Sequence, residues 1–416
     1  MESETPVSLT TNAKFRRILI AILLISLHIA YIYTFRIDVT TSWTPSNLAY
    51  TDSTKTNART LPKLRLSVPF YVYEELDWLN ATWKGRPIAE HSKFKHSDDY
   101  WVLISALQHP MRTRNASEAK IFVIPSLQNF FDERAFSKRS SLCLNTRCND
   151  ELMVYAAQIV TASPFFQKMP EAHLAVVSHW SHRTRWWKGK PIDSYISMLQ
   201  QSSNIHFENY PTNNGWSVPH MYVGQPCALE TNKTFDVALI ATFKPNVRNF
   251  QHRQTICNWL SNQSSVKVEQ CGKGTTCPAL AKARLGFHVR GDTLGANRLY
   301  DNLLSGTIPI FTMKKQYETV PQWINWTKIS YFMDIETMNE TLFLKEIAQI
   351  LQDTTTYEYK LKMLLANQHL FDWTTLYPFD TYMYMLQRHL FPETQHHSTS
   401  SSDAQLDPTQ SLLILP

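Results

Sequence analysis

Residues 287–311 read FHVRGDTLGANRLYDNLLSGTIPIF, and this stretch decides the fold. Its first apolar run predicts a strand that ends at Val289, and the run from Ile308 predicts a second strand. The polar, glycine-containing loop over residues 290–295 leads into a helix over 297–305, which a glycine C-cap closes. Because strand, loop, helix and strand follow one another, the stretch predicts an α/β unit with parallel strands.

The loop of this unit combines several groups that bind phosphate. A loop that meets a helix N-terminus presents backbone N–H groups and the positive end of the helix dipole to an anion. Arg290 and Arg298 add planar guanidinium forks that match phosphate oxygens, and Asp292 and Thr293 lie between them. Asp301, one turn into the helix, is placed to accept hydrogen bonds from ribose hydroxyls. A plain surface loop followed by a charged helix is the alternative that the residues leave open.

Short apolar runs alternate with amphipathic stretches on both sides of this unit. They predict strands and helices in two groups, separated by an irregular segment over residues 211–234. We therefore expect an α/β fold of two Rossmann-like domains whose parallel sheets face a cleft, with ligands at the carboxyl ends of the strands. The predicted strands are 64–73, 120–124, 173–178, 235–242, 285–289 and 308–312, and the predicted helices are 98–108, 150–162, 251–261, 297–305 and 342–351.

Three blocks of the central stretch resemble the nucleotide-binding signature of the exostosin family of glycosyltransferases. They are RGDT at 290–293, NRLYD at 297–301 and SGTIPI at 305–310. Further blocks follow the family's order, and the resemblance covers roughly residues 64–345. These blocks are YWVLISALQHPMRTRNASEAKIFVIP at 100–125, a strand followed by an arginine at 235–253, and INWTKISYF at 324–332.

The resemblance implies a GT-B fold preceded by one N-terminal transmembrane helix. It also implies a nucleotide-sugar donor, held mainly by the second domain, whose diphosphate Arg290 and Arg298 neutralise. Asp301 would hold the ribose, and Arg253 and Arg248 would reach the same phosphates from a neighbouring strand end. The nucleotide sugar is a substrate in this interpretation, so neither a cofactor nor a metal is expected.

The same resemblance implies an inverting hexosyl- or pentosyltransferase that acts on a glycan or glycoprotein acceptor. A general base would assist the attacking hydroxyl, and His179 and Glu208 are weak candidates near predicted strand ends. The chain departs from the family pattern at FHV (287–289), where members commonly have Cys-Pro or Cys-x-Pro, and at HW (179–180), where an acidic residue is usual. The acceptor half of the reaction is therefore unassigned.

A membrane anchor is expected near the N-terminus. Residues 18–35 are nearly all apolar, and Lys14, Arg16 and Arg17 precede them. A run of about 18 apolar residues can cross a bilayer as a helix, and its basic flank stays cytoplasmic. This predicts a single-pass type II protein of the Golgi membrane with a lumenal catalytic part. A cleaved signal peptide is the open alternative, although no small-x-small cleavage site follows.

Sequons for N-glycosylation favour the same compartment. All of them lie after the anchor, as expected for a segment that is exposed to the lumen. They are Asn80, Asn115, Asn232, Asn262, Asn325 and Asn339.

The six cysteines also favour an oxidising lumen, where disulfides form. Two pairs lie close enough in sequence to close small loops, which leaves one pair by default, although six cysteines allow 15 connectivities. The sequence contains no CxxC, so a metal site is disfavoured. The expected pairs are Cys143–Cys148, Cys271–Cys277 and Cys227–Cys257.

The order of segments along the chain follows from these features. The net charge of +6 is mild for 416 residues and gives no reason to expect a nucleic-acid partner. The expected partners are the donor, the acceptor, the membrane and other transferase chains in a homo- or hetero-oligomer. The expected segments are a cytoplasmic tail (1–17), the anchor (18–35), a Ser/Thr-rich stem (36–61), an acceptor domain (62–225), a nucleotide-sugar domain (226–340), helices that pack across both domains (341–392) and a disordered tail (393–416).

Two other classes compete with the glycosyltransferase. A Golgi sulfotransferase would use residues 272–276, GKGTT, as a phosphate loop, although a hairpin between Cys271 and Cys277 explains the same residues. A non-catalytic carbohydrate-binding protein would stack sugars on some of the 12 tryptophans. A metal-dependent transferase would need an Asp-x-Asp, which the sequence lacks.

Overall fold

The computed structural model describes much of the chain between residues 66 and 392, all within one compact unit, Ala58–Pro416. The expected anchor, stem and C-terminal tail lie outside the described residues. Within the described part, no helix has both the length and the apolar character needed to span a bilayer. The described ranges are 66–76, 82–83, 86–87, 98–125, 148–177, 193–206, 215–225, 227–230, 232–244, 247, 250–261 and 263–392.

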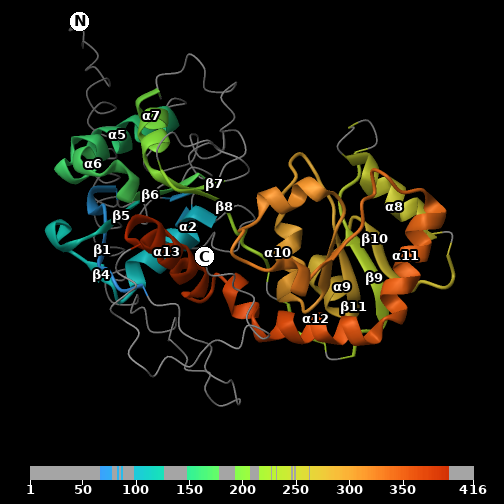
Figure 1. Ribbon diagram of the computed structural model, residues 1–416. Helices are drawn as coiled ribbons and strands as arrows, with labels where there is room; N and C mark the ends of the chain where they lie inside the picture. The colour runs from blue at the N-terminus through green and yellow to red at the C-terminus, as the bar shows by residue number, and fades with distance from the viewer. Residues whose placement is uncertain are drawn as a thin grey trace, which may run out of the picture. The chain divides into compact units, whose positions relative to one another are not determined.

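Six parallel strands form the first sheet, in the order β4-β1-β5-β6-β7-β8 (Figure 1). Every residue of β5 and β6 is buried, as expected for a parallel sheet that helices cover. A separate antiparallel pair joins β2 (Thr82–Trp83) to β3 (Arg86–Pro87). The strands are β1 (Phe70–Val72), β4 (Arg112–Thr113), β5 (Ile121–Ile124), β6 (His173–Val177), β7 (Ser203–His206) and β8 (Ser217–Pro219), and the helices are α2 (Asp98–Gln108), α5 (Cys148–Ala162), α6 (Pro164–Lys168) and α7 (Asp193–Gln201).

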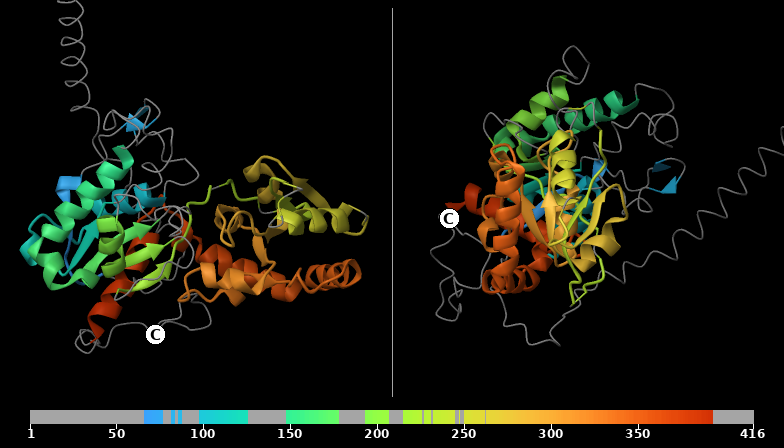
Figure 2. Two further views of the ribbon diagram at one scale, coloured as in Figure 1. Left: turned by 90° about the horizontal axis from the view of Figure 1, so that it is seen from above. Right: turned by 90° about the vertical axis from the view of Figure 1, so that its right-hand side faces the viewer.

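Five parallel strands form the second sheet, in the order β10-β9-β11-β12-β13. Helices cover both faces of this sheet (Figure 2). On one of them α8 meets α11 where the rings of Trp259 and Phe343 lie 5.1 Å apart. The strands are β9 (Phe235–Ile240), β10 (Val268–Gly272), β11 (Ala283–His288), β12 (Ile308–Phe311) and β13 (Tyr331–Phe332), and the helices are α8 (Gln251–Ser261), α9 (Thr276–Lys282), α10 (Asn297–Leu304), α11 (Glu340–Gln352), α12 (Thr354–Ala366) and α13 (Tyr377–Leu390).

The expected α/β class with two parallel sheets is confirmed. The helices expected at 98–108 and 251–261 have these bounds in the structure, because each carries an uninterrupted apolar face. The sequence missed β4, β7, β8 and β10, which are short and contain polar residues such as Arg112 and Asn204, whereas β13 lies within the block at 324–332 that resembles a strand of the family. Such strands lack the apolar run or alternation from which a strand is predicted, and their neighbours in the sheet decide their conformation.

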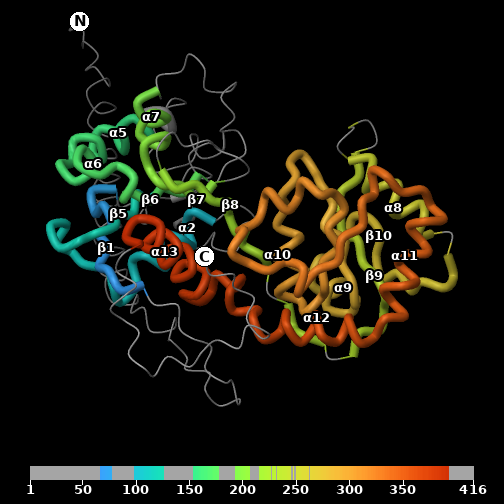
Figure 3. The backbone as a smooth tube through the Cα atoms, viewed as in Figure 1, coloured from blue at the N-terminus to red at the C-terminus, as the bar shows by residue number. Residues whose placement is uncertain are grey.

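The C-terminal helix α13 returns to the first sheet, where it packs against α2 (Figure 3). His109, just after α2, hydrogen-bonds through Nε2 to the Asp380 carboxylate of α13. The Ser67 N–H donates to Gln387 Oε1 at 2.8 Å, and Gln387 Nε2 donates back to Ser67 Oγ at 2.7 Å. The preceding helices α11 and α12 contact elements of the second sheet instead. The described part of the chain therefore begins and ends beside the same sheet.

Two of the three expected disulfide pairings are wrong. Cys227 bonds to Cys277, and Cys257 bonds to Cys271. Cys271 is the penultimate residue of β10 and Cys277 is the second residue of α9, and their side chains bond to different partners. Closeness in sequence therefore misled the pairing, because the fold brings α8 against β10 and the segment before β9 against α9. The expected Cys143–Cys148 bond lies outside the described residues, since only the backbone of Cys148 is described.

Candidate functional site

The second sheet reverses its strand order beside β9, and the carboxyl ends of β9 and β11 form the switch point. The chain passes from β9 outward to β10 and then returns to β11 on the other side of β9. Open α/β sheets bind ligands where the loops from two such ends diverge. Residues 289–296 follow β11, so the loop that the sequence predicts to bind phosphate starts at this switch point.

Hydrogen bonds inside the loop fix its shape. The Gly291 N–H donates to the Thr293 carbonyl oxygen at 2.9 Å, and the Thr293 hydroxyl donates to the Gly295 carbonyl oxygen at 2.9 Å. Thr293 is buried, so its hydroxyl serves the backbone of the loop. The expected role of Thr293 as a direct donor ligand stays a prediction, and its observed contact is structural.

A buried glutamine that the sequence analysis missed ties the loop to the neighbouring strand. Gln316 Nε2 donates to the carbonyl oxygen of His288, at the end of β11, at 2.9 Å. Its Oε1 accepts the N–H groups of Thr312 and Met313 at 2.8 and 3.0 Å, just after β12. One side chain therefore satisfies three backbone groups at the carboxyl ends of two strands. No sequence signal marks this glutamine, because its role depends on which strands are neighbours.

Arg253, which the sequence places at the phosphates, holds the loop from behind. From the first turn of α8, its Nε donates to the Arg290 carbonyl oxygen at 2.9 Å and its Nη1 donates to the Thr242 carbonyl oxygen at 2.8 Å. Its guanidinium also lies 4.2 Å from the centroid of the Phe250 ring. Burial and the nearby positive charge of Arg298 lower the pKa of Arg253 to about 10. Arg253 thus joins the loop after β9 to the loop after β11.

Arg290 and Arg298 stand in a different situation from Arg253. The buried Nε atom of each has no hydrogen-bond partner among the described residues, and neither forms an ion pair with them. Burial lowers the pKa of the Arg298 guanidinium, while the Asp301 carboxylate raises it in part. Removing a cation from water without a partner is costly, so such a site favours an anion that completes the missing bonds.

The two acidic residues of the predicted site are engaged in other contacts. Asp301 Oδ1 accepts the N–H of Gln225 at 2.8 Å, in the segment that enters the second sheet. Asp292 is exposed, and its carboxylate lies 3.5 Å from Lys244 Nζ. Lys244 follows β9 and was missed in the sequence, although its place after a predicted strand was a usable signal. The predicted binding of ribose by Asp301 therefore has to share this carboxylate with Gln225.

His252 interacts electrostatically with Arg290 of the loop and with two carboxylates. Burial lowers the pKa of His252, in the first turn of α8, and the positive charge of Arg290 lowers it further. The Glu336 and Asp334 carboxylates, which follow β13, oppose that shift. These groups place both signs of charge around His252.

The remaining predicted residues are exposed, or lie outside the described residues. His179, Glu208 and Arg248 lie outside, as do the sequons at Asn80 and Asn262. The sequons at Asn115, Asn232 and Asn339 are exposed, and the one at Asn325 is partly buried. Within the described part of the chain, no group of three His, Cys, Asp or Glu residues is arranged to hold a metal ion.

The rival phosphate loop at residues 272–276 is poorly placed. It follows the edge strand β10, away from the switch point, and leads into α9, which has only seven residues. The Lys273 carbonyl oxygen accepts a bond from the Gln270 side chain at 3.2 Å, and the two flanking cysteines are tied to other elements. The segment is a connection between β10 and α9.

The exostosin GT47 domain family matches residues 64–351, which is more than half of the chain. The chain therefore belongs to this family, and it is a glycosyltransferase. The match spans both sheets and the loop after β11, and the resemblance inferred from the sequence is confirmed. A comparison with curated proteins finds no match.

Solved structures give only distant likenesses. The chain resembles a chain of the GtfA/B complex with 9% identity and a TM-score of 0.36, covering 58% of this chain and 61% of that one. It resembles HepE of Anabaena in complex with UDP-glucose with 10% identity and a TM-score of 0.36, covering 76% and 98%. It resembles an α1,3-fucosyltransferase with GDP with 11% identity and a TM-score of 0.34, covering 79% and 94%. Likenesses at this level carry no argument about substrate or mechanism.

Proposed function

We propose that this glycosyltransferase transfers a hexose or pentose from a nucleotide sugar to a glycan or glycoprotein acceptor in the secretory pathway. The donor diphosphate binds at the loop over residues 289–296, against Arg290 and Arg298. The two parallel sheets face each other across a cleft in a GT-B arrangement, with the acceptor at the first sheet.

The observation that carries this proposal is the pair of guanidinium groups without partners at the switch point. The buried Nε atoms of Arg290 and Arg298 have no hydrogen-bond partner among the described residues, and both arginines lie beside the N-terminus of α10 and the loop of Gly291. A diphosphate leaving group develops negative charge as its bond to the sugar breaks, and fixed cations stabilise that charge without reorganising. Lys244 and Arg253 extend the positive region toward β9.

The transfer inverts the anomeric centre. The acceptor oxygen forms a bond to the anomeric carbon while the bond from that carbon to the diphosphate oxygen breaks, and a base takes the hydroxyl proton. His179 and Glu208 remain weak candidates for this base. Neither a metal nor a cofactor is needed in this scheme, since the arginines neutralise the diphosphate.

The compartment follows from the N-terminal apolar run and from the chemistry of the catalytic part. The two disulfides and the exposed sequons support an oxidising lumen. We place the protein in the Golgi membrane as a single-pass type II protein, with residues 18–35 as its anchor. A cleaved signal peptide would instead release the same lumenal part.

Donor hydrolysis tests the site without knowledge of the acceptor. The full-length protein in detergent is incubated with a panel of UDP- and GDP-sugars, and the released nucleoside diphosphate is measured. The wild type should hydrolyse one class of donor, and Arg290→Ala should lose most of this activity. The matched control is Arg284→Ala, which removes the same charge from the amino end of the same strand and should keep the activity. Equal hydrolysis by the wild type and Arg290→Ala would show that the donor binds elsewhere.

A further inference from the structure

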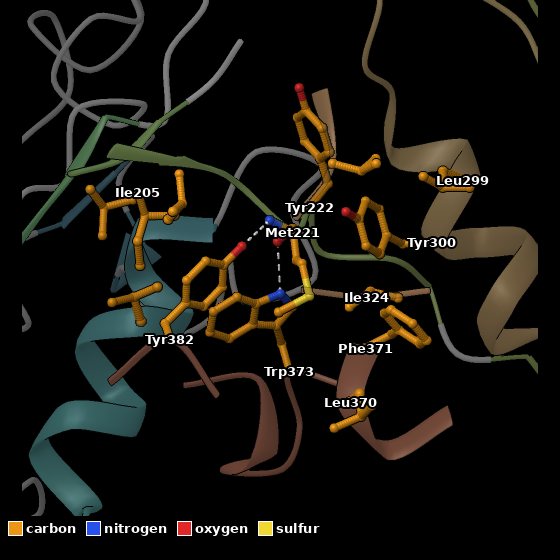
Figure 4. Packing of buried hydrophobic residues seen from close by; sticks show 14 of the residues in the cluster. Ile205, Met221, Tyr222, Leu299, Tyr300, Ile324, Leu370, Phe371, Trp373 and Tyr382 are labelled. Carbon is orange, nitrogen blue, oxygen red and sulfur yellow. Dashed lines mark hydrogen bonds between the residues drawn. The ribbon is translucent and has the colours of Figure 1, made fainter. Parts of the chain in front are cut away.

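The segment over residues 219–225 joins β8 of the first sheet to the second sheet, and side chains from distant parts of the chain hold its backbone (Figure 4). The Met221 N–H donates to Tyr382 Oη at 2.6 Å, and Trp373 Nε1 donates to the Met221 carbonyl oxygen at 2.9 Å. Tyr382 Oη in turn donates to the Pro219 carbonyl oxygen at 2.9 Å. A segment held at each of these groups is a built joint between the two sheets.

Val223 is the residue at which this joint meets both halves of the described chain. Its N–H donates to Asp98 Oδ1 at 2.6 Å, and Asp98 lies in the first turn of α2 beside the first sheet. Its carbonyl oxygen accepts from Asn297 Nδ2 at 3.0 Å, and Asn297 starts α10, the helix that follows the phosphate loop. The backbone of Val223 therefore connects α2 to α10 through the side chains of Asp98 and Asn297.

Close packing prevents the joint from sliding along α10. A Cβ atom on Gly224 would lie 2.6 Å from the Tyr300 carbonyl carbon, and one on Gly295 would lie 2.7 Å from Tyr222 Oη. The Gln225 N–H is bound by Asp301 of the same helix at 2.8 Å. The backbone of the joint and that of α10 are thus in contact, so a displacement of one has to displace the other.

The buried carboxylate of Asp98 needs a reason. Its side chain is fully buried, and stability alone is served equally well by a well-packed apolar residue, since taking a carboxylate out of water is costly. A titratable neighbour is His220, whose Nε2 lies 3.9 Å from Asp98 Oδ1, and burial lowers the pKa of His220 to about 3. The histidine is therefore neutral and does not neutralise the charge. The carboxylate of Asp98 does form a short, directional bond to the Val223 N–H, at 2.6 Å.

We propose that Asp98 and Asn297 are positioning residues that set the first sheet relative to the donor loop by clamping Val223. The inference rests on the proposed function, because it matters only if the donor binds at α10 and the acceptor at the first sheet. Transfer requires the acceptor oxygen to lie about 3–3.5 Å from the anomeric carbon, and a displacement of about 1 Å can cost on the order of 100-fold in rate. A fixed joint supplies such accuracy.

Hydrogen exchange with a bound nucleotide tests the clamp. The probe is UDP or GDP, whichever the full-length wild type binds by calorimetry. In the wild type the nucleotide should slow amide exchange in the loop 289–296, and also in residues 219–225 and in α2. In Asp98→Ala, which removes the acceptor of the Val223 N–H, and in Asn297→Ala the nucleotide should still bind within about twofold, but its protection of α2 should fall to about a third or less. The double variant should lose no more of the protection of α2 than the more strongly impaired single variant, because both side chains act on the same residue.

Asn302→Ala is the matched control. Asn302 is also a buried asparagine of α10, but its Nδ2 donates to the Gly286 carbonyl oxygen of β11 at 3.2 Å and does not touch the joint. Its loss should lower stability and leave the protection of α2 intact. Undiminished protection of α2 in both clamp variants, or no protection of α2 in a wild type that binds nucleotide, would overturn the inference. A wild type that binds no nucleotide would instead refute the proposed function on which it rests.

Discussion

The arginines at the two ends of strand β11 differ in their interaction partners. At the amino end, Arg284 lies 3.8 Å from the Asp236 carboxylate and 4.3 Å from the centroid of the Tyr357 ring. At the carboxyl end, Arg290 and Arg298 have no such partners among the described residues. The fold thus pairs a cation with a carboxylate where the strand begins, whereas the two arginines near its end have buried Nε atoms without a hydrogen-bond partner among the described residues.

This difference separates charges that serve the fold from charges that serve a ligand. A parallel sheet brings all its carboxyl ends to one edge, where loops diverge and no further strand covers them. A cation that is left unpaired there lowers stability unless an anion binds, so its presence indicates a ligand. The predictions below test that separation, from the largest expected effect to the smallest.

Arg298→Ala should abolish most of the nucleotide affinity without unfolding the protein. Charge-assisted bonds contribute about 1.5–3 kcal/mol each, so the dissociation constant of a nucleoside diphosphate should rise on the order of 30- to 100-fold. The free energy of unfolding should stay the same or rise slightly, because a costly buried cation is removed. Calorimetry and thermal unfolding measure the two effects. A large loss of stability with affinity retained would assign Arg298 to the fold instead.

Acidification should destabilise the edge of the sheet through His288, next to this site. The ring is fully buried, and burial together with the charges of Arg298 and Arg253 lowers the pKa of His288 to about 3. The unfolded chain therefore binds more protons below its ordinary pKa of 6.5, so stability is present above that pH and is lost as the pH falls toward 3. Between about pH 7 and pH 5, this histidine should account for about 2 kcal/mol of lost stability.

His288→Leu measures that contribution, because it removes the titrating ring and leaves no bonded partner behind. Denaturant unfolding of wild type and variant at both pH values gives the difference. If the wild type and His288→Leu lose the same free energy of unfolding on acidification, the pKa of His288 is not lowered in the folded protein.

Arg253→Lys should have an intermediate effect on nucleotide binding. Lysine keeps the charge but cannot bond both the Arg290 and Thr242 carbonyl oxygens in the planar geometry of a guanidinium. The loop after β11 should loosen, and affinity for the nucleoside diphosphate should fall about tenfold, or about 1.4 kcal/mol. Retention of full affinity would show that the loop keeps its shape through Gln316 and its internal bonds alone.

Lys273→Ala should have the smallest effect, namely none on donor hydrolysis or nucleotide binding. Lys273 lies in the connection after the edge strand β10, where its backbone carbonyl accepts a bond from the Gln270 side chain. A sulfotransferase that used this segment as its phosphate loop would lose all activity with the same change. Loss of activity in this variant would therefore contradict the assignment of the donor site to the loop after β11.

Much of the candidate donor site could be predicted because its parts are local. The strand, the loop and helix α10 follow one another within 25 residues, and Arg290, Asp292 and Arg298 lie where a strand–loop–helix unit places phosphate ligands. The supporting contacts are distant in sequence. Gln316 and Lys244 reach the loop from other strands, and Arg253 turned out to hold the backbone of the loop through two carbonyl oxygens.

The sequence by itself determined the α/β class, the family and the loop that carries the arginines, since apolar periodicity and short motifs are written along the chain. The tertiary structure alone decided the disulfide partners, the short polar strands, and the binding of Asp98 and Asn297 to Val223. It also decided which arginines are neutralised. Arg284 and Arg290 are chemically identical and six positions apart. Their surroundings give them different roles. Asp236 and Tyr357 pack against Arg284 at one strand end, whereas the Nε atom of Arg290 at the other end has no hydrogen-bond partner among the described residues.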